Sequence, residues 1–206
     1  MSWDKIFQQK EWGKYPPIEL VQFIARNYYD KNRANTKILD AGCGTGACTW
    51  YLAREGFDTY GVDSSETGVK LTISRLLREG LSAKVSEGFL SDLHFENGYF
   101  DCVVDVVALT HNPFQDIRKI ISEYHRVLKK GGKLFIILFA EGTTAFNFSK
   151  GGIELYGVEL TIHLFKESNL KEMFNPFKLL EIERISRTVG NRAKLINQFT
   201  IVGEKC

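Results

Sequence analysis

The sequence lacks the features that mark membrane-spanning and multidomain proteins. Its longest apolar run, residues 134–140, is far too short to cross a bilayer, which takes about 20 apolar residues. The first residues are polar and charged, and no apolar signal-peptide core follows them. Only 4 prolines occur, and no repeat or linker divides the chain. We therefore expect a single domain over residues 1–206, with an N-terminal lid and helix in 1–30, a ligand-binding core in 35–140, and a substrate-side insertion with closing strands in 141–206.

Cysteine and unbalanced charge are also scarce. The 4 cysteines form no CxxC pair and no ligand cluster with the 4 histidines, so we expect no metal. We interpret them as small core residues of a cytoplasmic protein, because free thiols suit a reducing compartment. The net charge is +2 and no long run of like charges appears, so neither nucleic acid nor a membrane surface is indicated as a partner. A basic patch formed only on folding would escape this test.

The sequence does contain a regular alternation of short apolar segments and amphipathic segments. The predicted strands are residues 37–40, 57–62, 82–86, 99–106 and 133–140. The predicted helices are residues 18–29, 47–54, 66–79 and 115–130. Strands separated by helices of this length require crossover connections. The pattern therefore predicts a doubly wound α/β fold, with a parallel sheet covered by helices on both faces.

The helices of residues 66–79 and 115–130 have the clearest apolar faces. In the first helix, the predicted buried residues are Val69, Ile73, Leu76 and Leu77. In the second helix, they are Ile117, Ile120, Ile121, Tyr124, Val127 and Leu128. Lys129 and Lys130 are expected at the negative end of the second helix, which Gly131 would terminate.

The pattern changes after residue 140. Residues 141–152 are predicted to form a loop, and residues 153–164 alternate like a strand or a hairpin. A short helix is expected over residues 167–174. Residues 178–185 and 198–202 then form two closing strands, whose short connection indicates an antiparallel pair.

The chemistry of the sequence concentrates in residues 38–46, which read Ile-Leu-Asp-Ala-Gly-Cys-Gly-Thr-Gly. A strand that runs through glycines into a helix lets a ligand approach bare backbone at the carboxyl edge of a parallel sheet, because Gly42, Gly44 and Gly46 carry no Cβ. Asp63 ends the next strand about 20 residues further on, where a carboxylate can accept from both hydroxyls of a ribose. The same residues also satisfy the nicotinamide-dinucleotide fingerprint, so this turn alone leaves the cofactor open.

Five short motifs resemble, in register, those of the class I S-adenosylmethionine-dependent methyltransferases, particularly the small stand-alone members. They are residues 38–46 (ILDAGCGTG), 60–65 (YGVDSS), 88–95 (GFLSDLHF), 100–104 (FDCVV) and 126–132 (RVLKKGG). Dehydrogenases share the first two motifs and lack the others. The resemblance implies a Rossmann-like, seven-stranded and mostly parallel sheet with an antiparallel C-terminal strand and an N-terminal helical lid. It also implies methyl transfer with S-adenosyl-L-methionine as cofactor.

The resemblance further implies where the cofactor would bind. The residues expected around its methionine part are Asp40, Ala41, Gly42, Cys43, Gly44 and Gly46. Asp63 would hold the ribose, with Ser64 beside the adenine, and Phe89 and Leu90 would cover the adenine ring. The family often has an acid where Phe89 stands, and phenylalanine cannot accept from the adenine amino group. The amide of Leu90, or the side chain of Ser91 or Asp92, would have to bind the ring instead.

Two further groups of residues each allow two interpretations from the sequence alone. Residues 105–107 would approach the methionine part, or the side chain of Asp105 would cap the loop that follows the fourth strand. The N-terminal stretch 3–17 resembles the lid of such enzymes. Tyr15 would then close over the methionine end, with Lys14 meeting the carboxylate, or both would simply pack at a proline turn.

Methyl transfer from a sulfonium is a direct displacement, so the protein mainly aligns the acceptor and excludes water. If the acceptor is a hydroxyl, a histidine is a suitable general base. His111, which follows the fourth strand, is the first candidate for this role, although it would also serve as a loop support. His163 is the second candidate. Residues 112–114 (Asn-Pro-Phe) are interpreted as a turn that leads into a helix, not as the NPPY motif of amino-group methylators.

The segment 141–148 with Tyr156 lies where this family builds acceptor pockets. We therefore expect a small-molecule acceptor, most simply a hydroxyl. The alternatives are a methyltransferase for RNA or protein, a nicotinamide-dependent oxidoreductase, and a cofactor-binding protein without activity. A strongly basic surface around residues 105–114 would favour the RNA or protein acceptor.

Overall fold

The computed structural model describes residues 2–10, 12–148 and 152–206. The longer helices are α1 (Ser2–Gln9), α2 (Ile18–Tyr28), α3 (Ala47–Arg54), α4 (Glu66–Arg78), α5 (Phe114–Val127) and α6 (Glu167–Met173), and the 3-10 helices are η1 (Arg33–Asn35) and η2 (Leu109–His111). The strands are β1 (Lys37–Ala41), β2 (Asp58–Asp63), β3 (Lys84–Glu87), β4 (Phe100–Val106), β5 (Leu128–Phe139), β6 (Ile153–Leu155), β7 (Val158–Leu160), β8 (Lys178–Val189) and β9 (Lys194–Glu204). The predicted loop of residues 141–152 lies partly outside the described residues.

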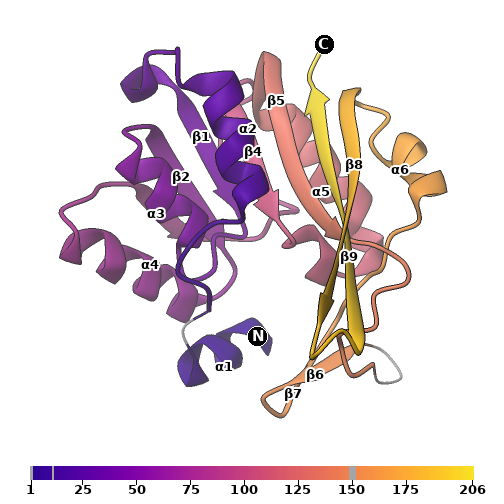
Figure 1. The fold of residues 1–206 in the computed structure, drawn as a ribbon. Coiled ribbons are helices and arrows are strands. Elements are labelled where there is room, and N and C mark those ends of the chain that lie inside the picture. Colours follow the sequence, from indigo (N-terminus) through magenta and orange to yellow (C-terminus); the bar gives the residue numbers. More distant parts are fainter. Residues whose placement is uncertain (1, 11, 149–151) are drawn as a thin grey trace.

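A 7-stranded sheet in the order β3-β2-β1-β4-β5-β9-β8 forms the centre of the molecule (Figure 1). The strands from β3 to β5 are parallel to one another, and β9 runs antiparallel to both β5 and β8. The order reverses between β1 and β4, which is where open α/β sheets bind ligands at their carboxyl edge. The predicted doubly wound sheet with an antiparallel C-terminal strand is confirmed.

Helices cover both faces of this sheet and create two cores. α2 and α3 pack on one face, and α5 and α6 pack on the other. Successive residues of a strand point to opposite faces, so Ile38 belongs to the first core and Leu39 to the second. The apolar face predicted for α5 is fully buried, as expected from its spacing.

α1 and the β6–β7 hairpin lie at the carboxyl edge of the sheet. Figure 1 shows α1 below the sheet, between α4 and the β6–β7 hairpin. Ile6 and Phe7 of α1 share a small apolar cluster with Ile153 and Leu160 of the hairpin. Residues 153–164 were predicted to form a strand or a hairpin, and the antiparallel pairing of β6 with β7 shows a hairpin. Among the described residues, no helix is both long enough and apolar enough to cross a bilayer.

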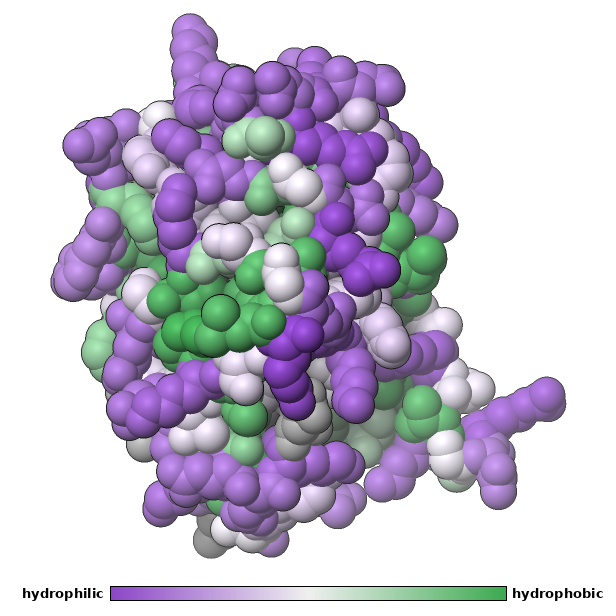
Figure 2. Space-filling view, turned by 90° about the vertical axis from the view of Figure 1, so that its left-hand side faces the viewer, coloured by the Kyte–Doolittle hydropathy of each residue, from purple (hydrophilic) through white to green (hydrophobic). Residues whose placement is uncertain are grey.

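The buried face of α4 differs from the prediction. Val69 and Leu76 are buried as expected, but Ile73 is 39% exposed and Leu77 is 73% exposed. Residues four apart advance by about 40° around a helix, so the row from 69 to 77 turns away from the sheet. Arg75 is buried in their place. Figure 2, which faces the side of the molecule where α4 lies, shows an apolar patch surrounded by hydrophilic side chains.

The end of α5 is a second difference. Lys129 and Lys130 were expected in the last turn of the helix, but α5 ends at Val127 and both lysines belong to β5. The lysines therefore do not cap the helix. The ammonium of Lys129 instead lies 2.7 Å from the carboxylate of Asp101 in β4, which joins the two strands. Gly131, with a φ of 75°, lies within the strand and does not end the helix.

Candidate functional site

The glycine turn after β1 brings bare backbone to the carboxyl edge of the sheet. Gly42 and Gly44 have φ angles of 77° and 52°, which residues with a Cβ rarely adopt. A Cβ on Gly42 would lie 2.2 Å from the Cβ of Ala108, and a Cβ on Gly44 would lie 3.3 Å from the ring of Phe7. The amide of Gly42 donates to the carbonyl of Val62 at 2.8 Å, which ties the turn to β2. Both backbone angle and space therefore require glycine at position 42.

Asp63 is the last residue of β2 and bonds directly to this turn. Its Oδ2 accepts from the amide of Gly44 at 2.8 Å, and its Oδ1 accepts from the amide of Ser65 at 2.8 Å. Burial raises the pKa of this carboxyl, and the backbone donors act in the opposite direction. A carboxylate has about four acceptor positions, so the group retains capacity for further donors such as the two hydroxyls of a ribose.

Asp40, Ala41 and Cys43 are buried beneath the turn. The hydroxyl of Thr49, in the first turns of α3, donates to Oδ2 of Asp40 at 2.6 Å. Burial raises the pKa of Asp40 to about 7 and raises that of the Cys43 thiol well above its usual range. These side chains therefore hold the turn against α3 and the sheet.

Asp105, near the carboxyl end of β4, caps the loop that follows. It is fully buried; its Oδ1 accepts from the amide of Ala108 at 2.7 Å, and its Oδ2 accepts from the amide of Leu109 at 3.0 Å. The hydroxyl of Tyr124 also donates to Oδ2 at 2.7 Å, and burial raises the pKa of Asp105 to about 7. Of the two roles left open by the sequence, the carboxylate thus has the geometry of the loop cap. Val107 beside it has a φ of 62°, an outlier for a β-branched residue.

The segment expected to cover an adenine ring lies next to the glycine turn. Leu90 is buried, and its Cδ1 would lie 3.8 Å from a Cβ on Gly42. Phe89, in contrast, is 58% exposed, and Ser64 is half-buried beyond the end of β2. Leu90 therefore reaches the site, whereas the ring of Phe89 lies mainly in solvent.

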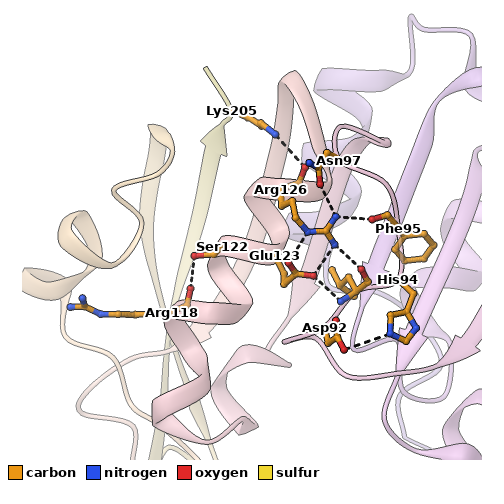
Figure 3. A network of polar contacts seen from close by, with 10 residues as sticks. Asp92, His94, Phe95, Asn97, Arg118, Ser122, Glu123, Arg126 and Lys205 are labelled. Atoms are coloured by element: carbon orange, nitrogen blue, oxygen red, sulfur yellow. Dashed lines mark hydrogen bonds and ion pairs between the residues drawn. The ribbon is translucent and has the colours of Figure 1, made fainter.

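Arg126 of α5 holds the segment that follows Leu90 (Figure 3). Its guanidinium donates to the carbonyl of Leu93 at 2.6 Å and to that of Phe95 at 2.7 Å. It also pairs with the carboxylate of Glu123 at 2.7 Å, and Glu123 in turn accepts from the amide of Leu93 at 2.8 Å. This pair fixes the loop by its backbone, so it positions Leu90 without touching the glycine turn.

α1 lies across the edge of the sheet and covers the turn. The ring of Phe7 packs where Gly44 and Gly68 leave space for it. Asp4 accepts from the hydroxyl of Ser65 at 2.7 Å, which attaches α1 to the beginning of α4. Next to Asp4 in the first turn of α1, the ring of Trp3 meets that of His111 edge-on, with centroids 4.9 Å apart.

His111, in η2, is held in one tautomer. Its Nδ1 lies 2.7 Å from the carbonyl of Thr161, so Nδ1 carries the proton and Nε2 carries the lone pair. Burial lowers the pKa of His111 to about 4, so the ring is neutral near pH 7. His163 uses its Nε2 to contact the carbonyl of Asn112 at 2.9 Å. Pro113 directly precedes α5, so the expected helix-leading turn is confirmed.

Lys14 and Tyr15 lie against α3. Tyr15 is 72% exposed, and its ring meets that of Trp50 edge-on with centroids 5.6 Å apart. Within the N-terminal stretch, the ring that packs against the glycine turn is that of Phe7.

Sequence reasoning missed several residues that shape this site. Asp4 and Phe7 belong to α1, which has only 8 residues. So short a helix does not predict from its apolar spacing which element it packs against. Arg126 and Glu123 stand three residues apart, which is a signal for a pair on one helix face, yet no sequence pattern shows that they hold a distant loop. The left-handed backbone of Val107 has no sequence signal.

Comparison with known proteins supports this picture. The family model described as a methyltransferase domain matches residues 38–132. A ubiquinone biosynthesis O-methyltransferase of Pseudomonas syringae pv. tomato is 28% identical over 145 residues, covering 69% of this chain and 62% of that protein. A ribosomal RNA small subunit methyltransferase C of Alcanivorax borkumensis is 34% identical over 110 residues, covering 49% of this chain and 31% of that protein. The chain spans less than two thirds of the length of either relative.

A solved structure also resembles the whole fold. A SAM-dependent methyltransferase of Methanosarcina mazei matches with a TM-score of 0.73 at 24% identity, covering 88% of this chain and 96% of that chain. The residues matched by the family model include the glycine turn, Asp63 and Arg126. Residues 38–132, slightly less than half of the chain, thus match a methyltransferase domain, and the chain as a whole has the fold of a SAM-dependent methyltransferase.

Proposed function

We propose that this protein binds S-adenosylmethionine and transfers its methyl group to a hydroxyl of a small molecule. The observation that carries the proposal is the bond between Asp63 and the amide of Gly44. This bond sets an acceptor for a ribose diol directly beside a turn of glycine backbone, over which the ring of Phe7 packs. The match to the methyltransferase family model argues against a nicotinamide cofactor, which the glycine turn and Asp63 alone had left open.

The residues of the site fit this cofactor. Asp63 would hold the ribose, the backbone of Gly42 and Gly44 would lie along the methionine part, and Leu90 would pack against the adenine. Arg126 is a positioning residue, since it acts on this site through the loop that carries Leu90. The cofactor supplies an activated methyl group when bound.

The chain itself would orient the acceptor and keep water away. α1 covers the turn through Phe7 and Trp3, so it has to move for ligands to enter and would exclude water once it returns. His111 lies at the edge of this cover and presents a neutral Nε2. As the acceptor oxygen takes up the methyl group, its hydroxyl proton would pass to Nε2 of His111.

The surroundings of His111 favour a small acceptor with an apolar body. The rings of Trp3 and Phe139 pack edge-on to the imidazole, and the ring of Phe146 packs against Phe139. Residues 105–114, whose basic character would have favoured RNA, contain no lysine or arginine. An RNA or protein acceptor therefore gains no support at this edge.

The activity is tested by incubating the protein with S-adenosylmethionine and a panel of phenols and alcohols, and then measuring products by mass spectrometry. We expect one acceptor class to gain a methyl group, with an equal amount of S-adenosylhomocysteine formed. His111→Gln should lower this turnover, whereas His94→Gln, which changes a histidine whose side chain is 87% exposed, should not. Methylation of RNA in the same assay, with none of any small molecule, would contradict the proposed acceptor.

A further inference from the structure

A cavity of about 500 Å³ lies between the chain before α2 and the C-terminal halves of the helices α3 and α4. None of the residues assigned above to the ribose, the adenine or the base lines it. Its cationic lining side chains are Lys14, Arg54, Arg75 and Arg78. This concentration of positive charge is local, because the whole chain carries a net charge of only +2.

Arg75 is the buried member of this group. Its side chain is 8% exposed, and within the described part of the chain Nη1 has no hydrogen-bond acceptor. Its guanidinium stacks over the ring of Trp50 at 4.4 Å from the centroid, which fixes its plane. Nη1 itself is not accessible from the cavity, so Arg75 contributes a positive charge of fixed orientation to the lining and not a direct contact through this atom.

Internal carboxylates neutralise only part of the charge. Among the described residues that line the cavity, the one acidic side chain is that of Glu79. Its carboxylate lies 3.6 Å from the guanidinium of Arg54 and 3.9 Å from that of Arg75. Its Oε2 also accepts from Nε1 of Trp50 at 2.6 Å. Lys14 and Arg78 have no ion-pair partner among the residues that the structure describes. An anion that enters the cavity therefore meets cations that no carboxylate of the chain already neutralises.

We propose that this cavity binds a compact polyanion, a small molecule that carries a di- or triphosphate group. Arginine forks match phosphate oxygens in geometry, and a diphosphate can contact several of these cations at once. The volume is within the range of small-molecule sites, about 300–1,000 Å³. A nucleic-acid strand is less suited, because it needs an extended basic groove, whereas α4 also exposes the apolar side chains of Ile73 and Leu77.

Calorimetry with inorganic pyrophosphate at fixed ionic strength tests this site without any methyl donor. We expect saturable binding with one pyrophosphate per chain. Arg78→Gln and Lys14→Gln should each weaken binding by about tenfold, because each removes a charge-assisted contact. Both side chains are exposed, so the fold should survive the change. Arg118→Gln, which removes an exposed charge from α5, is the control and should leave the affinity unchanged.

A second pair of variants removes a negative charge instead of a positive one. Glu79→Gln removes the carboxylate from the cavity while its amide oxygen can still accept from Trp50, so it should tighten pyrophosphate binding severalfold. Glu172→Gln, which removes an exposed carboxylate beside Arg118, should not. Absence of saturable binding, or equal effects of Arg78→Gln and Arg118→Gln, would overturn the proposal. It would also be overturned if a single-stranded oligoribonucleotide bound more tightly than pyrophosphate and lost its affinity with the same substitutions.

Discussion

Asp4 and Ser65 join the N-terminal helix to the site that it covers. The Asp4 carboxylate accepts from the Ser65 hydroxyl at 2.7 Å and from the amide of Thr67 at 2.9 Å, so a residue of α1 caps α4. These bonds lower the pKa of Asp4 below its usual value. The amide of the same Ser65 donates to Asp63. The cover and the ribose acceptor are thus attached to one residue.

Asp4→Ala is therefore expected to loosen α1 and to leave the rest of the fold in place. Loss of a capping carboxylate typically weakens a helix start by about 0.5–2 kcal/mol. The open population of α1 should rise roughly two- to thirtyfold, and trypsin should cut faster at Lys5 and Lys10. Asp30→Ala, at an exposed position after α2, is the control. Unchanged cleavage at these lysines would show that Asp4 does not anchor the cover.

Gly42→Ala separates steric fit from backbone strain when compared with Gly56→Ala. Both glycines have positive φ angles, 77° and 85°, so either substitution should lower the free energy of unfolding by about 1–2 kcal/mol. A Cβ at position 56 meets nothing within 4 Å, whereas one at position 42 would lie 2.2 Å from Ala108. Urea unfolding should show a clearly larger loss for Gly42→Ala. Equal losses in the free energy of unfolding would mean that the glycine turn shifts to accommodate the added Cβ, so that space does not require glycine at position 42.

Arg126→Gln should release the loop that carries Leu90. The guanidinium makes charge-assisted bonds to the carbonyls of Leu93 and Phe95, and its removal leaves Glu123 without its partner (Figure 3). We expect a loss of about 1.5–3 kcal/mol in the free energy of unfolding. Affinity for S-adenosylhomocysteine should also fall severalfold.

Arg118→Gln on the same helix is the matched control for this variant. The Arg118 side chain is 81% exposed and pairs with the equally exposed Glu172, so its loss should change stability by about 0–1 kcal/mol. If both variants lost equal stability and equal affinity, the loop would not depend on Arg126.

His111 gives the activity a defined pH dependence. Burial lowers its pKa to about 4, so the base is neutral above pH 5 and becomes protonated only below that range. The acidic limb of the pH–rate profile should therefore lie near pH 4, provided the fold persists, and not near the usual histidine value of about 6.5. His111→Gln should reduce kcat by roughly a hundredfold or more and leave S-adenosylhomocysteine affinity nearly unchanged. A limb at pH 6.5 that survives this substitution would exclude His111 as the base.

The sequence predicted the sheet well because apolar periodicity reports burial directly. β1, β4 and the buried face of α5 follow from their spacing, and the position of Asp63 follows from where β2 stops. The buried face of the outer helix α4 was harder to predict. Its apolar row turns around the helix axis, and the structure buries Arg75 while it exposes Leu77, since an arginine guanidinium can stack on an aromatic ring, here that of Trp50.

The parts of the site that the sequence could not predict depend on contacts between distant segments. The Thr161 carbonyl that fixes the tautomer of His111 comes from the chain after β7. Likewise, the ring that packs on Gly44 comes from Phe7, and neither residue carries a signal of the other. Local motifs thus locate the glycine turn and the acid, whereas the cover, the base and the loop clamp require the folded chain.

The most direct test of this account is calorimetry with S-adenosylhomocysteine on the wild-type protein, Asp63→Asn and Asp58→Asn. Asp58 begins the strand that Asp63 ends, so the control loses the same charge at the opposite edge of the sheet. We predict that the wild-type protein and Asp58→Asn bind alike, and that Asp63→Asn binds about ten- to a hundredfold more weakly, because a charge-assisted contact contributes about 1.5–3 kcal/mol. Equal affinity of all three proteins, or no binding by any of them, would contradict the placement of a ribose between Asp63 and the glycine turn.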